Sequence, residues 1–183
     1  MGAESAQDRD PPPRATFRRA NWPEDLEVVR RLFHEYRQWL TDHQDSAPDS
    51  QARVRSGLAL MDRLIDRLPG AYGPPRGDVL LWFEDGSLVA CGALRELEPG
   101  TGELKRLYVR ADYRGKAFGV PFVRALIDRA RELGYESLRS YTLPSMAAAI
   151  EFYQELGFQP IAGYWPHPAA GALFFELRVI PFT

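Results

Sequence analysis

The sequence has a single cysteine, Cys91, in 183 residues. One thiol excludes an internal disulfide framework and any cysteine-rich zinc site. Because Cys91 lies in the apolar run 88–94, we expect a buried structural thiol rather than a nucleophile. The three histidines, His34, His43 and His167, do not have the spacing of metal ligands, so we expect no metal.

Long apolar runs and a strong excess of one charge are also missing. No segment is long enough to cross a bilayer, and the first 14 residues lack the apolar core of a signal peptide. The formal net charge of -2 provides no general attraction to nucleic acid or to an anionic membrane. We therefore expect a cytoplasmic protein that binds neither nucleic acid nor membrane.

The composition that remains is that of one folded domain. Residues 1–14 are polar and end in three prolines, and such a segment cannot bury enough apolar surface to offset the entropy of ordering. We predict a disordered tail there. Residues 15–183 are enough for a single domain with a sizeable core, and two full domains would be crowded.

The spacing of apolar residues predicts a chain in which strands and helices are mixed. Asp85-Gly86 lies between two extended runs and is a strong signal for a two-residue hairpin. A strand, a helix and a second strand between residues 104 and 143 predict a parallel βαβ unit. The expected strands are 16–20, 79–84, 87–94, 104–109, 137–143, 158–162 and 172–179; the expected helices open at Pro23 and span about 53–68, 118–133 and 145–156, with loops at 41–53 and 69–77.

The segment 103–120 combines the end of a strand, a basic turn and the glycine-bearing start of a helix. Free backbone N–H groups and the positive end of the helix dipole make such a place an anion site, and Gly115 and Gly119 let a ligand approach the backbone. It is not a P-loop, because Gly115-Lys116 is followed by Ala117 instead of Ser or Thr. The alternative is that the two glycines only shape a turn.

Two motifs in this half of the chain resemble those of the Gcn5-related N-acetyltransferase (GNAT) family. The order from Arg114 to Gly119 is similar to the family's acyl-CoA cradle: Gln or Arg, two residues, Gly, any residue, then Gly or Ala. The run 149–158 resembles the family's following helix, in which Tyr153 is followed after three residues by Gly157-Phe158. The resemblance covers about 16–179 and is closest over 103–158.

The resemblance implies an α/β fold with a mixed, mostly antiparallel central sheet, one parallel βαβ unit and helices on both faces. It implies an acetyl-CoA-dependent N-acetyltransferase that uses no metal, with an amine of a small molecule or a protein as acceptor. In the family, the pantetheine arm pairs with a splayed strand and backbone amides hold the pyrophosphate. The residues matching those roles are Leu107, Tyr108 and Val109 for the arm, and Arg114, Gly115, Lys116, Ala117, Phe118, Gly119 and Val120 for the pyrophosphate.

Two side chains match catalytic groups of the family. Tyr153 matches the general acid that protonates the departing CoA thiolate, and a satisfied core tyrosine is the alternative. Glu103 lies at the offset of a strand carboxylate that acts as base in the histone-modifying branch; an ion pair with Lys105 or Arg106 is the alternative. The competing function is a catalytically silent acyl-CoA-binding or sensing module.

The chain departs from the family at two positions. Ala117 stands where the family prefers Gly, so its methyl group would crowd the pyrophosphate, and Met146 stands where many members have a polar Asn. Tyr72 and the segment 164–167 lie on loops where the family builds its acceptor pocket, or they are aromatic residues that cap the core. The sequence leaves open the acceptor amine and the oligomeric state, with a homodimer among the alternatives.

Overall fold

The computed structural model describes residues 15–43, 48–115, 119–144, 146–165 and 171–179. In this part of the chain, seven strands form one sheet in the order β1-β2-β3-β4-β5-β7-β6. The predicted disordered tail, 1–14, lies outside the described residues, as do Lys116, Ala117 and Phe118.

The first four strands form an antiparallel meander. β1 (Ala15–Arg19) pairs with β2 (Asp78–Glu84), and β2 pairs with β3 (Ser87–Glu98). Asp85 and Gly86 between β2 and β3 have φ of 48° and 79°, as a primed hairpin turn requires. This confirms the predicted hairpin. β3 ends at Glu98 instead of residue 94 and turns at Gly100 into β4 (Thr101–Val109).

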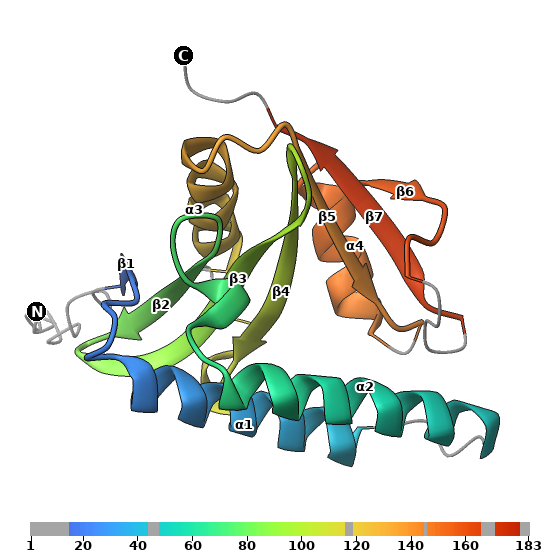
Figure 1. Cartoon of the computed structure of the whole chain (residues 1–183), viewed down its shortest axis with the longest axis horizontal. Helices are drawn as coiled ribbons and strands as arrows, with labels where there is room; N and C mark the ends of the chain where they lie inside the picture. The colour runs from blue at the N-terminus through green and yellow to red at the C-terminus, as the bar shows by residue number, and fades with distance from the viewer. Residues whose placement is uncertain (1–14, 44–47, 116–118, 145, 166–170, 180–183) are drawn as a thin grey trace, which may run out of the picture.

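The predicted βαβ unit is confirmed. β4 leads through α3 (Gly119–Glu132) to β5 (Ser137–Thr142), and the two strands are parallel. Their register joins only Thr101–Glu103 with Ser137–Arg139, after which the strands diverge (Figure 1). On its other side, β4 pairs with β3 through a bulge at Arg106, whose φ is 56°. The extra residue bends β4 away from β5.

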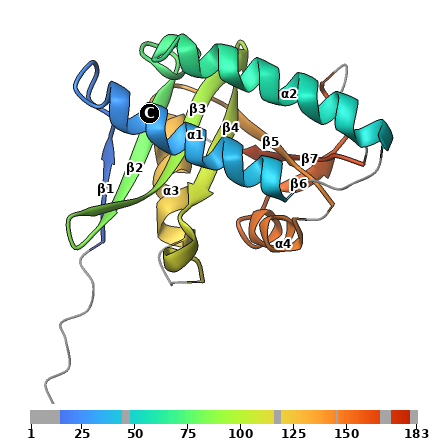
Figure 2. The same ribbon diagram turned by 90° about the horizontal axis from the view of Figure 1, so that it is seen from below.

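Helices cover both faces of the sheet, as predicted. α1 (Leu26–Asp42), α2 (Pro48–Asp66) and the short η1 (Gly70–Tyr72) lie on one face, and α3 and α4 (Ala147–Glu155) lie on the other (Figure 2). Each face has its own buried core: Phe33, Ile65 and Tyr72 contribute to the first, and Phe122 and Leu126 to the second. β7 (Leu173–Arg178) and β6 (Gln159–Ile161) complete the sheet beyond β5.

Two predicted helix starts are wrong. The first helix begins at Leu26 rather than Pro23, because the residues before it form a turn that Asp25 closes by accepting the backbone N–H of Asn21. The second begins at Pro48 rather than residue 53, so the predicted loop 41–53 is shorter. A proline and an aspartate suit a helix's first turn as well as a loop. In the described part of the chain, no helix is long and apolar enough to span a bilayer.

Candidate active site

The divergence of β4 and β5 leaves one edge of β4 without a strand partner beyond Glu103. Leu107, Tyr108 and Val109 lie on this stretch, and the last two pair on their other side with Cys91 and Ala90 of β3. An extended ligand chain can add to such an edge as a strand would. The three residues therefore lie on an edge without a strand partner, and their role in binding an acyl-CoA arm stays a prediction.

The basic turn follows directly from this edge. After η2 (Ala111–Tyr113), Gly115 has φ of 73°, a conformation that L side chains rarely adopt. α3 then begins at Gly119, where an added Cβ would lie 3.7 Å from the Phe152 ring of α4. The start of α3 thus lies beside α4. Because the three residues between Gly115 and Gly119 are outside the described part, the pyrophosphate cradle stays a prediction.

Arg114 is held by contacts outside the turn itself. Its Nε donates to the Val109 carbonyl at 2.9 Å, and its guanidinium lies 4.9 Å from the centroid of the Trp39 ring of α1. The end of β4, the basic turn and α1 are therefore joined through one side chain.

Tyr153 lies on α4 and points into the sheet. Only 5% of the residue is exposed, and its ring packs against Phe158 and Phe175. Its hydroxyl is 2.9 Å from Ser140 Oγ on β5, and Ser140 also donates to the Leu104 carbonyl at 3.1 Å. Burial raises the pKa of Tyr153, which keeps the phenol protonated at neutral pH as a general acid requires. The same contacts satisfy a core tyrosine.

Glu103 is fully buried and saturated with donors. Its Oε2 is contacted by Arg95 Nε and Nη2 at 2.8 and 2.6 Å. Its Oε1 accepts hydrogen bonds from Tyr164 and Trp165, both at 3.0 Å, and lies 3.3 Å from Lys105 Nζ. Burial by itself would raise the pKa of Glu103, but the charges of Lys105 and Arg95 outweigh it and hold the pKa below the usual value. The carboxylate is therefore ionised and has little capacity left to accept a proton.

The ion-pair alternative for Glu103 is partly confirmed. Lys105 is one partner, as expected, but the other is Arg95 instead of Arg106. Arg95 lies directly opposite Glu103 in the β3–β4 register. Because the predicted strand ends at residue 94, Arg95 lies outside it and its pairing with Glu103 could not be predicted. A hairpin extended beyond Leu94 would have placed the two residues opposite each other.

Lys105 lies between Glu103 and two aromatic rings. Its Nζ is 3.8 Å from the centroid of Tyr141 on β5 and 5.6 Å from that of Trp165, and 11% of the side chain is exposed. Burial lowers the pKa of Lys105 to about 7, against the opposing effect of Glu103. Near neutral pH the amine is therefore present in both protonation states. Neither Tyr141 nor Ser140 was recognised from sequence, because β5 meets β4 only through the crossover.

The aromatic residues of the two loops lie in different surroundings. Tyr72 is 1% exposed and makes an edge contact with Phe33, so it caps the core. Tyr164 and Trp165 instead reach Glu103, which brings the segment after β6 to the diverging strands. Pro166 and His167 lie outside the described residues.

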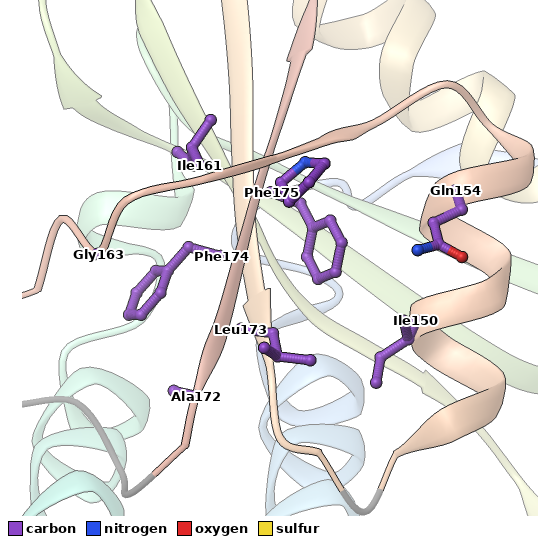
Figure 3. Close-up of a pocket in the computed structure, with 9 residues that line it drawn as sticks. Ile150, Gln154, Ile161, Gly163, Ala172, Leu173, Phe174 and Phe175 are labelled. Atoms are coloured by element: carbon purple, nitrogen blue, oxygen red, sulfur yellow. The ribbon is translucent and has the colours of Figure 1, made fainter.

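An apolar cavity of about 380 Å³ lies between α4, β6 and β7 (Figure 3). Its lining includes Ile150 and Gln154 of α4 and Leu173, Phe174 and Phe175 of β7, but no charged side chain. Such a lining does not suit a phosphate. Within the described residues, no three His, Cys, Asp or Glu side chains form a group that could hold a metal ion.

Comparisons with known proteins agree with this geometry. The model of the acetyltransferase (GNAT) family matches residues 30–158. An uncharacterised N-acetyltransferase of Schizosaccharomyces pombe is 34% identical over 110 residues, which make up 59% of this chain and 68% of that protein.

Two solved structures share the fold. The PaiA N-acetyltransferase of Thermoplasma acidophilum, in complex with coenzyme A, is 19% identical with a TM-score of 0.66, over 90% of this chain and 99% of that one. The Salmonella typhimurium protein YncA, with its cofactor acetyl-CoA, is 20% identical with a TM-score of 0.61, over 90% of this chain and 94% of that one.

Proposed function

The chain belongs to the acetyltransferase (GNAT) family, and from this premise we propose that it moves an acetyl group from acetyl-CoA to an amine by direct attack in a ternary complex. The acceptor is an amine of a small molecule or of a protein. No covalent enzyme intermediate is needed, because most of the gain comes from orienting two bound substrates.

The observation that carries the proposal is the opening between β4 and β5. It leaves the edge of Leu107–Val109 without a strand partner, and the chain then reaches Gly115 and the start of α3, so backbone pairing for an extended arm is followed along the chain by N–H groups for an anion. Acetyl-CoA supplies an activated acyl group on an arm of this shape. Backbone N–H groups of β4 would polarise the thioester carbonyl.

Tyr153 and the polar cluster around Glu103 lie on opposite faces of the sheet where the strands diverge. Tyr153 faces α4 and the second core, whereas Glu103 and Lys105 face Tyr164 and Trp165. We propose Tyr153 as the acid for the leaving thiolate. Glu103, which the resemblance makes the base, is proposed to act as an ionised anchor for the cluster, since its oxygens are already occupied.

Calorimetry with acetyl-CoA tests the binding half of the proposal. Gly115→Val places a branched side chain at φ of 73° in the basic turn and should weaken binding at least tenfold. Gly86→Val is the matched control, because Gly86 has φ of 79° and, like Gly115, no atom within 4 Å of an added Cβ, but lies in the β2–β3 hairpin. Absence of binding by the unmodified protein at millimolar acetyl-CoA refutes the proposal.

Release of free thiol from acetyl-CoA in the presence of an amine panel tests turnover. An enzyme releases thiol with at least one amine, and mass spectrometry finds the acetylated product. A silent binding or sensing module binds acetyl-CoA in the calorimeter but releases no thiol above the rate without protein. That result would replace the catalytic proposal with the binding one.

A further inference from the structure

Lys105 is one of only two lysines among the 23 basic residues of the chain. The basic neighbours of Lys105, Arg95 and Arg106, both carry guanidinium groups. A guanidinium does not release its proton near neutral pH, whereas a lysine in a buried place readily does. The chain thus has the ionisable amine at the position where the strands diverge, and arginine almost everywhere else.

The charges around Lys105 favour its neutral form. The titratable and charged groups facing it are Glu103 and Arg106 on β4, Arg95 on β3 and Tyr141 on β5. Arg95 and Lys105 therefore share the buried carboxylate of Glu103, and Arg106 adds a third positive charge nearby. Such an excess of positive charge is relieved when one cation loses its proton, and Lys105 is the member of the cluster that can do so.

The same surroundings can also hold the proton once it arrives. The ammonium form of Lys105 would lie 3.8 Å from the centroid of the Tyr141 ring and 3.3 Å from Glu103 Oε1. A ring face and a carboxylate both stabilise a cation. Arg106 Nε is buried and has no hydrogen-bond partner among the described residues. The positive charge of Arg106 opposes a second cation nearby and so limits the stabilisation of the ammonium form of Lys105. The surroundings of Lys105 therefore allow both its neutral amine and its ammonium form.

We propose that Lys105 accepts the proton that the acceptor amine loses when it attacks the thioester, and that Glu103 positions Lys105. This rests on the function proposed above. The acceptor nitrogen forms a bond to the thioester carbon, and the carbon–sulfur bond breaks with its electron pair going to sulfur. The proton on the acceptor nitrogen passes to the neutral Lys105 Nζ. Tyr153 protonates the sulfur and regains its proton from solvent, and Lys105 releases to solvent the proton that it accepted.

Direct titration of the amine tests the inference without any activity. In protein labelled with [ε-¹³C]lysine, the two lysines give two signals, and Lys116→Arg assigns them. We expect the Lys105 signal to titrate with a midpoint of about 7, far below the ordinary lysine value of about 10.4. A midpoint above about 9 would overturn the proposal, because Lys105 would then be a permanent cation.

The pH dependence of kcat/KM tests the chemical role, with the amine that the unmodified enzyme acetylates fastest. Lys105→Met and Lys105→Arg should lower kcat at pH 7.5 by about 10²-fold to 10⁴-fold and leave acetyl-CoA affinity within about threefold. Glu103→Gln should move the acid limb of the profile to lower pH, because removing the anion lowers the pKa of Lys105 further. Ionisation of the acceptor contributes equally to every variant and cancels.

The opposite pattern assigns the base to Glu103. If Lys105→Met retains the acid limb and most of kcat while Glu103→Gln loses both, Lys105 is only an ion-pair partner. Circular dichroism and acetyl-CoA calorimetry show that each variant is folded and binds. If no amine is acetylated by the unmodified protein, the proposed function fails, and the lysine titration still decides whether Lys105 is a neutral amine.

Discussion

Replacing Tyr153 with Phe separates the two roles that its position allows. The substitution removes one hydroxyl from a buried ring and leaves the contacts with Phe158 and Phe175. Ser140 keeps its hydrogen bond to the Leu104 carbonyl, so no buried partner is left unsatisfied. The lost hydrogen bond should therefore cost about 1 kcal/mol of unfolding free energy. For a domain of this size that lowers Tm by roughly 2–4 °C.

A general acid would have a much larger effect on turnover. If Tyr153 protonates the leaving thiolate, Tyr153→Phe should lower kcat by about 10²-fold or more, which corresponds to a rise of about 2.7 kcal/mol in the barrier. The assay is thiol release at saturating acetyl-CoA, with calorimetry to check that acetyl-CoA still binds. A core tyrosine predicts a rate close to that of the unmodified enzyme.

Ser140→Ala is the matched control. It breaks the same 2.9 Å hydroxyl contact and also the hydrogen bond to the Leu104 carbonyl, so it should lower stability by at least as much, but it leaves the phenol of Tyr153 in place. Its turnover should remain within a few-fold of the unmodified enzyme. A folded Tyr153→Phe variant with a near-normal rate removes the acid assignment. An equal loss of rate in Ser140→Ala means that the hydrogen bond, and not the acid, is what matters.

Three further predictions concern other parts of the chain. Ala117→Gly should leave the calorimetric affinity for acetyl-CoA equal or tighter, because it restores the residue that the family's cradle prefers; a large loss would show that the methyl group is part of the site. The thiol of Cys91, whose pKa burial raises to about 12, should not react with a disulfide reagent at pH 8 until the protein is unfolded, and fast labelling of the native protein contradicts its burial. Since the pKa of Lys105 is lowered to about 7 in the folded state, the unfolded state binds more protons between pH 7 and 10, and the free energy of unfolding from urea titrations should rise with pH from 7 to 9. Lys105→Met should flatten that rise, and an equal slope in both proteins would contradict the lowered pKa.

The order of the elements could be predicted from the sequence because it depends on local patterns. The residue types of Asp85 and Gly86 favour the turn with positive φ that the structure shows. The helical spacing of apolar residues predicts α3, whose apolar residues are buried on one face. The end of β3 could not be predicted in the same way. Three of the four residues from Arg95 to Glu98 are charged, which is not typical of a strand, and pairing with β4 keeps them extended.

In the candidate site, too, features within one local motif could be predicted from sequence, and contacts between distant segments could not. The Gly115 turn, the β4 edge and Tyr153 could be proposed from sequence because each belongs to a contiguous motif. The partners of Glu103 were not, because Arg95, Lys105, Tyr164 and Trp165 come from two strands and a loop up to 70 positions apart.

Spacing, turn residues and the two motifs are therefore sufficient for the order of the elements along the chain, the βαβ unit and the family. These patterns depend on the conformation of only a few neighbouring residues, so they can be recognised without the tertiary structure. The protonation states of Glu103 and Lys105 needed the folded protein, because a pKa depends on burial and on charges that only the packed sheet brings within a few ångströms. The motifs locate the chemistry on β4 and α4, and the tertiary contacts decide which side chain there is free to take a proton.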